Sequence, residues 1–448
     1  MHLPLLLPAV LPPVLVGGLG TTQVLRGHGL WFDELYTVAV VDRPLGDVVG
    51  LVADGRGPTA WLTDPPAFNG PYYAVAWLWS RLPLVDLRSD GLDGLRGLSL
   101  LASVFAVAVL VRAVERLHGQ AVALVAGLLA AAAPLMVVQS VQARPYGLAL
   151  LATALALLGA VRVVQGGGVG LLAVAGGAAG LLHWFALPAV GGLALGTALV
   201  VRRKAPVLAV SVAALPVLGL VALALSHGAS GGGYLTTTGL LVPVSALVAW
   251  TGGVLALPVV VAVALGARAA GPLAWAWIGV PVVLVTAVDL VRPVFVPRYL
   301  LPTLLGLAVV AALGAVGRRW LLVLLVVAGV VADVRALTRP RWERADQVAA
   351  FLLAEQRPGE PVVAVEGRSA AGLAVYAAPT RLGADLRYPP DDPPAGATRV
   401  WLVRQLARDG ATVASDDDDL LRTDGLRLVR TELFRATKTD LAVQLWTR

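Results

Sequence analysis

Two neighbouring carboxylates, Asp33 and Glu34, follow the first long apolar stretch of the chain and lie between Trp31 and Tyr36. A carboxylate in a partly dry, aromatic setting can accept a proton from an attacking hydroxyl group. We therefore interpret this pair as a candidate catalytic centre. The alternative interpretation is two solvated acids in an external loop.

A third candidate acid, Asp64, precedes two prolines in Thr63-Asp64-Pro65-Pro66. The prolines hold the chain extended and present the preceding side chain rigidly. Asp64 could bind hydroxyl groups of the acceptor or donor, or help to hold a metal ion. An ordinary turn aspartate explains the same pattern.

Two arginines lie beside the predicted outer ends of apolar stretches: Arg144, before Pro145-Tyr146, and Arg298, in Pro297-Arg298-Tyr299. Guanidinium groups suit bidentate capture of phosphate oxygens. Snorkelling towards lipid headgroups is the alternative.

His183 lies at a third outer end, where it could donate a hydrogen bond to a phosphate or a sugar, although a lone histidine is usually structural. Arg96 begins the second apolar stretch on the outer side and could pair with a carboxylate of the first loop.

The elements that must position these side chains are membrane helices. Of the 448 residues, 58% are apolar and 14% are charged, whereas soluble domains carry about 25% charged residues. Apolar runs of roughly 20 residues can each cross a bilayer core of about 30 Å. We predict eleven spans, at about 4–25, 95–115, 120–139, 146–163, 168–183, 186–202, 206–226, 239–265, 273–290, 300–316 and 320–335.

Basic residues in the connections orient these spans. Five connections, all on one face of the membrane if no span is missed, carry Arg112 and Arg116, Arg162, Arg202 to Lys204, Arg268, and Arg318 with Arg319. The positive-inside rule makes that face cytoplasmic. The N-terminus is then inside, and the first loop, about residues 26–94, is outside. The net charge of +7 reflects topology rather than nucleic-acid binding, and the absence of cysteine excludes disulfides and thiolate chemistry.

The chain changes character after the last span, so we predict a membrane domain over 1–335 and an extracytoplasmic α/β domain over 336–448. Alternating patterns predict helices at 341–356 and 369–376, strands at 361–365 and 399–403, and a β pair at 426–434 and 441–446. In the first loop, residues 72–82 could form a helix on the membrane surface. The acidic run 416–419 fits a solvated loop better than a calcium site.

Carboxylates and cationic groups at the outer leaflet are what attack on a membrane-embedded phosphosugar requires. The base activates an acceptor hydroxyl, and the arginines stabilise the charge that develops on the phosphate. The sequence has no GxxxxGK[ST] loop for nucleotide phosphates, so the activated sugar is expected on a lipid carrier.

The chain resembles a C-type glycosyltransferase of the protein O-mannosyltransferase and aminoarabinose transferase superfamily. The resemblance rests on Asp33-Glu34 after the first span, Asp64-Pro65-Pro66 followed by Tyr72-Tyr73, Gln139-Ser140 through Arg144-Pro145-Tyr146, and Pro297-Arg298-Tyr299-Leu300-Leu301-Pro302, in that order. Trp342 to Val365 also resembles the soluble domain often appended to bacterial members. Asp64 departs from the family pattern, which has a histidine there, and the loop around Asn69 has an inserted glycine.

The resemblance implies a bacterial plasma-membrane enzyme with a polyprenyl-phosphate sugar donor, an inverting transfer outside the cytoplasm, and Asp33 as the base. Glu34 or Asp64 would orient sugar hydroxyls or replace Asp33 as the base, while Arg144, Arg298 and His183 hold the phosphate. Tyr72, Tyr146, Tyr299 and Arg96 complete the expected substrate-binding set.

The resemblance points to mannose or arabinose as the sugar. It leaves open a glycan, lipid or protein acceptor and the need for a divalent cation. A transporter or a flippase for lipid-linked sugars is the rival class, because intramembrane charges can also form a substrate path. A non-catalytic scaffold that binds partners through the C-terminal domain is a third class.

Overall fold

The computed structural model describes the chain except residues 1–2, 28, 60–61, 63–68, 83–86, 228–235, 339–343, 366, 388–395, 407–420, 423–424 and 437–439. The chain divides into two compact units. Unit 1 comprises Met1–Leu25, Arg43–Arg56 and Pro65–Thr338, and unit 2 comprises Arg26–Asp42, Gly57–Asp64 and Arg339–Arg448. The predicted first external loop is therefore shared between the two units.

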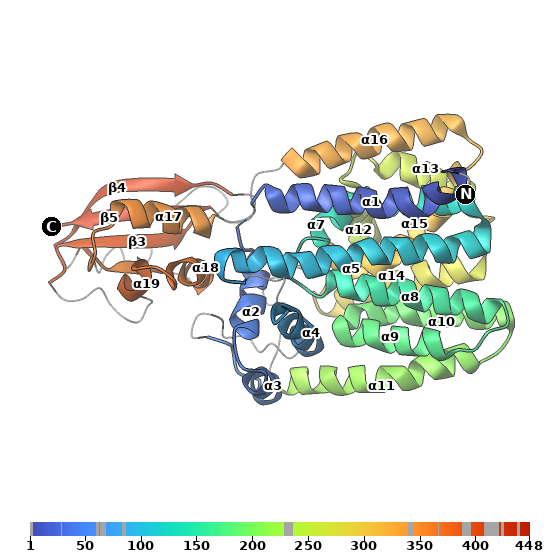
Figure 1. Ribbon diagram of the computed structural model, residues 1–448, viewed down its shortest axis with the longest axis horizontal. Coiled ribbons are helices and arrows are strands. Elements are labelled where there is room, and N and C mark those ends of the chain that lie inside the picture. Colours follow the sequence, from blue (N-terminus) through green and yellow to red (C-terminus); the bar gives the residue numbers. More distant parts are fainter. Residues whose placement is uncertain are drawn as a thin grey trace. The chain divides into compact units, whose positions relative to one another are not determined.

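Unit 1 is helical throughout its described elements (Figure 1). Its α-helices are α1 (Leu3–Leu25), α3 (Leu45–Asp54), α4 (Gly70–Ser80), α5 (Leu87–His118), α6 (Gln120–Ala131), α7 (Pro134–Gln139), α8 (Tyr146–Val164), α9 (Gly170–Leu182), α10 (Leu187–Val201), α11 (Ala205–Ser226), α12 (Val242–Thr251), α13 (Ala256–Gly266), α14 (Gly271–Val291), α15 (Leu301–Ala315) and α16 (Arg319–Thr338). Three short 3-10 helices, η2 (Trp184–Ala186), η3 (Gly239–Leu241) and η4 (Pro297–Leu300), precede α10, α12 and α15.

The eleven predicted spans consist mainly of helices, and the long apolar helices among them confirm a polytopic membrane protein. In the part of the chain that the structure describes, eight helices are long and apolar enough to cross a membrane, or nine if one bent pair counts as a span. Two of the predicted spans, now Gln120–Ala131 and Gly170–Leu182, are shorter apolar helices. The predicted span 120–139 is broken where α6 ends and Pro134 begins α7.

The predicted span 239–265 is also broken, because α12 and α13 meet at a bend of 114°. Gly252 and Gly253 follow α12 with φ of +64° and +82°. This left-handed backbone region ends a helix and is open to glycine without a side-chain clash. The apolar sequence alone gave no sign of the change in direction.

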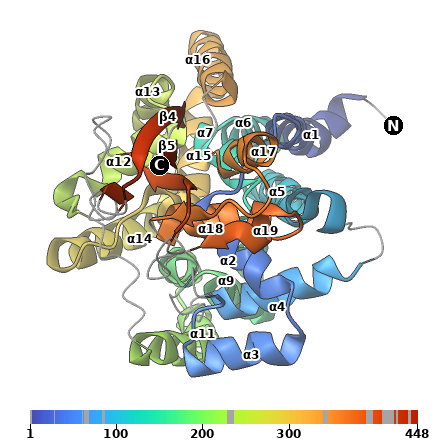
Figure 2. The ribbon, with the colours of Figure 1, turned by 90° about the vertical axis from the view of Figure 1, so that its left-hand side faces the viewer.

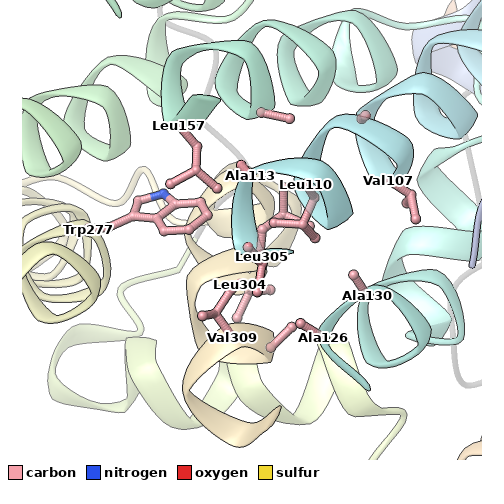
Figure 3. Close-up of a cluster of buried hydrophobic side chains, with 14 of the residues drawn as sticks. Val107, Leu110, Ala113, Ala126, Ala130, Leu157, Trp277, Leu304, Leu305 and Val309 are labelled. Atoms are coloured by element: carbon pink, nitrogen blue, oxygen red, sulfur yellow. The ribbon is translucent and has the colours of Figure 1, made fainter. Parts of the chain in front are cut away.

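The interior of unit 1 is a continuous apolar cluster. Figure 3 shows Leu110 of α5, Leu157 of α8, Trp277 of α14 and Leu304 of α15 meeting in it, and all four are buried. Small residues such as Ala126 let the helices approach closely, which matters in a membrane because lipid chains compete for apolar contacts. This packing fixes the helix ends that carry the candidate site.

Unit 2 is built on a five-stranded sheet with the order β2-β1-β3-β5-β4. Its strands are β1 (Val362–Ala364), β2 (Leu386–Arg387), β3 (Arg399–Gln405), β4 (Arg427–Phe434) and β5 (Leu441–Thr447). Strand β1 pairs in parallel with β2 and β3, while β5 pairs antiparallel with β3 and β4. The predicted strands, the closing β pair and the small α/β domain are confirmed.

The two faces of the sheet pack into different apolar clusters. Trp401 and Val403 face a cluster that includes residues of α17 (Ala345–Glu355), α18 (Gly367–Ala377) and α19 (Leu382–Asp385). Val400 and Leu402 face a second cluster with Leu421 and Trp446. The period of two places successive residues of β3 in different clusters.

Part of the predicted first external loop is built into this unit. Its helix α2 (Phe32–Val41) lies beside α18 in both views (Figures 1 and 2). The backbone amide of Leu30 donates a hydrogen bond of 2.9 Å to the hydroxyl oxygen of Tyr376 on α18. The C-terminal unit therefore supports the segment that carries Asp33 and Glu34.

Candidate functional site

The predicted acidic pair lies in the first turn of helix α2 rather than in an irregular loop. Glu34 is fully buried, and its Oε2 accepts a hydrogen bond of 3.1 Å from the backbone amide of Trp31. The contact satisfies a backbone donor that has no partner within the helix, as in a capping box. Glu34 thus has a structural task at the beginning of α2.

Asp33 is half-buried and lies on the same helical turn. The positive end of the helix dipole favours its negative charge. Phe32 and Tyr36 form an edge-on aromatic pair on α2, with ring centroids 5.6 Å apart. Both acids belong to unit 2. The third predicted acid, Asp64, lies outside the described residues.

Unit 1 brings the predicted phosphate-binding residue Arg298 and two predicted tyrosines together. The Nε of Arg298 donates a hydrogen bond of 2.6 Å to the hydroxyl oxygen of Tyr146. The guanidinium carbon lies 5.7 Å from the ring centroid of Tyr146 and 5.6 Å from that of Tyr299. The half-buried guanidinium is thus held by a phenol and by two aromatic faces.

Local helix boundaries explain why these side chains meet. Tyr146 is the first residue of α8, directly after Pro145, and Arg298 lies in the short helix η4 just before α15. Proline suits the first positions of helices because it has no amide to satisfy. Both side chains therefore project from helix beginnings.

His183 completes the cluster from a third element. The chain leaves α9 at His183 in an extended conformation, with φ of −153°, before η2 begins. The imidazole centroid lies 5.1 Å from that of Tyr146 and 5.3 Å from that of Tyr299. Burial first, and then the positive charges of Arg144 and Arg298, lower the pKa of His183 from 6.5 to about 3. The imidazole is therefore neutral at physiological pH and can exchange hydrogen bonds without adding charge.

The positive charge of Arg144 contributes to the lowered pKa of His183, so we include Arg144 with these residues. Hydrogen bonds to two other helices hold Arg144 in place. Its Nη1 donates a hydrogen bond of 3.3 Å to the hydroxyl oxygen of Tyr73 on α4. Its backbone oxygen accepts one of 3.3 Å from Ser99 Oγ on α5. Arg144 is half-buried.

Two residues of this arrangement had no predicted role. Tyr73 reaches Arg144, whereas its predicted neighbour Tyr72 is fully buried and packs against the Tyr73 ring at 5.7 Å. Phe185 stacks on Tyr299 with ring centroids 4.2 Å apart. The aromatic triplet His183-Trp184-Phe185 was the sequence signal for Phe185, but nothing local distinguishes Tyr73 from Tyr72.

The cluster, which we call the cationic aromatic cluster, therefore consists of Arg144, Tyr146, His183, Arg298 and Tyr299. A guanidinium group such as that of Arg144 or Arg298 suits the oxygens of an anion such as a phosphate. The aromatic rings of the cluster offer faces against which an apolar surface of a sugar can pack. Arg96, the remaining predicted binding residue, is buried on α5.

The described residues also bear on whether the protein could hold a metal ion. Within the described residues, which exclude Asp64, no group of three or more histidines, cysteines or acids could hold a metal ion. The sequence left the need for a divalent cation open, and the described residues do not test it.

The fold of this chain is shared by solved structures, and this likeness agrees, at the level of the fold alone, with the resemblance noted in the sequence. The solved structures that share this fold include ArnT from Cupriavidus metallidurans bound to undecaprenyl phosphate, with a TM-score of 0.60 over 99% of this chain and 98% of that chain at 12% identity. The apo structure of the same protein gives a TM-score of 0.54 over 93% and 94% of the two chains at 13% identity. No family model and no curated protein matches the sequence.

Proposed function

We propose that this protein is an integral-membrane glycosyltransferase that moves a monosaccharide from a polyprenyl-phosphate donor to an acceptor outside the cytoplasm. The observation that carries the proposal is the cationic aromatic cluster at the ends of apolar helices, in which Arg298 bonds to Tyr146 and the His183 ring contacts Tyr146 and Tyr299. The fold adds support, since the ArnT structure with this fold holds undecaprenyl phosphate.

The proposed reaction is a single displacement with inversion. The acceptor hydroxyl oxygen forms a bond to the anomeric carbon as the bond from that carbon to the phosphate oxygen breaks. Asp33 takes the proton of the hydroxyl group, and the polyprenyl phosphate leaves with the bonding electron pair. Arg144 and Arg298 stabilise the negative charge that develops on the phosphate, which is where fixed positive charge contributes most to the rate.

The remaining residues have binding roles in this proposal. His183, which is neutral, donates or accepts a hydrogen bond at the phosphate or the sugar, and Tyr146 and Tyr299 pack against the donor. Mannose or arabinose is the proposed sugar, and a polysaccharide, a lipid or a protein is the proposed acceptor. The proposed location is the bacterial plasma membrane, with the N-terminus in the cytoplasm and the C-terminal unit outside.

The base is tested by turnover of the purified full-length protein with a polyprenyl-phosphate sugar. Asp33→Asn should lose at least about a hundredfold in kcat, the usual size of a general-base contribution. Asp47→Asn is the matched control, because Asp47 is an exposed acid in the first turn of α3. Retention of most of the turnover by Asp33→Asn would rule out Asp33 as the base.

The donor role is tested by binding and by product release. Arg298→Ala should weaken donor binding, while the exposed Arg292, in the preceding loop, provides the control Arg292→Ala. Addition of acceptor should release polyprenyl phosphate from the donor. Movement of intact donor across the membrane without this release would identify a transporter or flippase instead.

A further inference from the structure

Asp289 is a fully buried acid near the end of the apolar helix α14 and has no part in the proposed reaction. Ionisable residues inside membrane helices are rare and costly, so such a residue calls for a physical reason. Its contacts supply one.

Both oxygens of the Asp289 carboxylate accept hydrogen bonds from backbone amides. Oδ2 accepts from Thr238 at 2.7 Å and from Gly239 at 2.8 Å. Oδ1 accepts from Val294 and from Phe295, each at 2.9 Å. A carboxylate is the side chain that can accept at all of these positions, because it has two oxygens and no donor.

These amides belong to two separate segments. Thr238 directly precedes η3 and Gly239 is its first residue, and η3 leads into α12. Val294 and Phe295 lie in the connection between α14 and η4, three to four residues before Arg298. Asp289 thus links two segments. One is the connection that precedes Arg298, and the other is the beginning of η3.

Apolar contacts hold the same connection from its other side. Phe295 and Leu300 are buried in a cluster with Val242 and Val285, against which Phe185 also packs. Phe185 in turn stacks on Tyr299. The segment from Val294 to Leu300 is therefore fixed at both ends, with Arg298 and Tyr299 between them.

We propose that Asp289 is a positioning residue for Arg298: its carboxylate fixes the connection 292–296 and thereby sets the guanidinium against Tyr146. The effect on donor affinity rests on the proposed function, whereas the effect on the connection does not. Asparagine in its place keeps one acceptor oxygen but turns an amide group towards two of the four backbone donors, which leaves those donors without acceptors.

The positioning itself is measured by hydrogen exchange of the full-length protein in detergent. In the wild type, the amides of Val294 and Phe295 should exchange slowly although they lie outside helices, and fast exchange there would overturn the proposal. Asp289→Asn should speed exchange over residues 293–296. Asp333→Asn is the matched control, because Asp333 is a buried acid on α16 outside these contacts, and it should leave this peptide unchanged.

The link to Arg298 is measured by a double-mutant cycle on the KM for the donor. Asp289→Asn should raise this KM and lower kcat, so that kcat/KM for the donor falls about tenfold, as expected for the loss of a charge-assisted hydrogen bond that positions a phosphate-binding group. In the Arg298→Ala background it should add nothing, since coupled residues are non-additive. A full effect in that background would overturn the proposal. A different result is faster exchange in Asp289→Asn together with a donor KM in Arg298→Ala equal to that of the wild type. This result would support the positioning by Asp289 and overturn the proposed role of Arg298 in donor binding.

Discussion

The side chain of Arg298 donates a hydrogen bond of 2.6 Å to the hydroxyl oxygen of Tyr146, a residue 152 positions earlier in the chain. This contact joins the beginning of α8 to the short helix before α15. It also orients a charged group whose flexible side chain would otherwise sample many rotamers. The first prediction concerns this bond.

Tyr146→Phe keeps the ring beneath the guanidinium but removes the hydroxyl acceptor. We expect the KM for the polyprenyl-phosphate donor to rise about fivefold, the equivalent of roughly 1 kcal/mol for one hydrogen bond. Steady-state kinetics with varied donor concentration measure this. A donor KM equal to that of the wild type would show that the bond does not orient Arg298 for binding.

His183 should make the protein less stable in acid. Its pKa is about 3 in the folded protein and 6.5 as the ordinary value. Between these values the unfolded imidazole binds a proton that the folded one does not, so stability falls as the pH falls from 6.5 towards 3. At pH 5 the loss is about 2 kcal/mol.

His183→Gln removes this titration, so the variant should lose less stability than the wild type between pH 7 and pH 5. Thermal unfolding in detergent at several pH values measures the difference. Equal losses for the two proteins would contradict a neutral, buried His183.

Glu360 should stabilise unit 2 through three hydrogen bonds. Its Oε1 accepts from Arg399 Nε at 2.6 Å, and its Oε2 accepts from Trp401 Nε1 at 2.9 Å and from the Arg357 amide at 3.1 Å. Burial raises the pKa of Glu360, but these bonds and the charge of Arg399 outweigh it, so that the pKa lies below the ordinary 4.5. The stabilisation is present above pH 4.5 and is lost as the pH falls through the lower folded value.

Glu360→Gln should therefore cost about 1–3 kcal/mol at neutral pH, because an amide cannot accept from both sides. Glu355→Gln is the control: its ion pair with Arg430 is 45% exposed on both side chains and is worth less than about 1 kcal/mol. Hydrogen exchange of the strand amides in the full-length protein measures the loss of stability in both variants. A loss for Glu360→Gln no larger than for Glu355→Gln would contradict the prediction.

Tyr376 should influence turnover through the segment that carries Asp33. Tyr376→Phe removes the acceptor of the Leu30 amide, directly before α2, and should loosen the first turn of that helix. We expect kcat to fall about 3- to 10-fold with the donor KM nearly unchanged, because orientation of a reacting group affects the chemical step. A raised donor KM with unchanged kcat would show that the C-terminal unit does not act through Asp33.

The sequence by itself determined the membrane class, the helical stretches and the strands of the C-terminal unit. Apolar runs of bilayer length and the alternation of 399–403 are local properties, so the nearby chain suffices to predict them. It also singled out Arg144, His183 and Arg298 as candidates, because charged or polar groups beside apolar stretches stand out from their surroundings.

Only the tertiary structure decided which of these residues share a site and which elements support them. The bend between α12 and α13, the bond from Tyr73 to Arg144 and the division of the first loop between two units depend on packing between distant segments. Asp289 shows the reason most clearly. An acid in the apolar stretch 273–290 is visible in the sequence, but its four backbone partners lie in two other segments, and only folding brings their amides to one carboxylate.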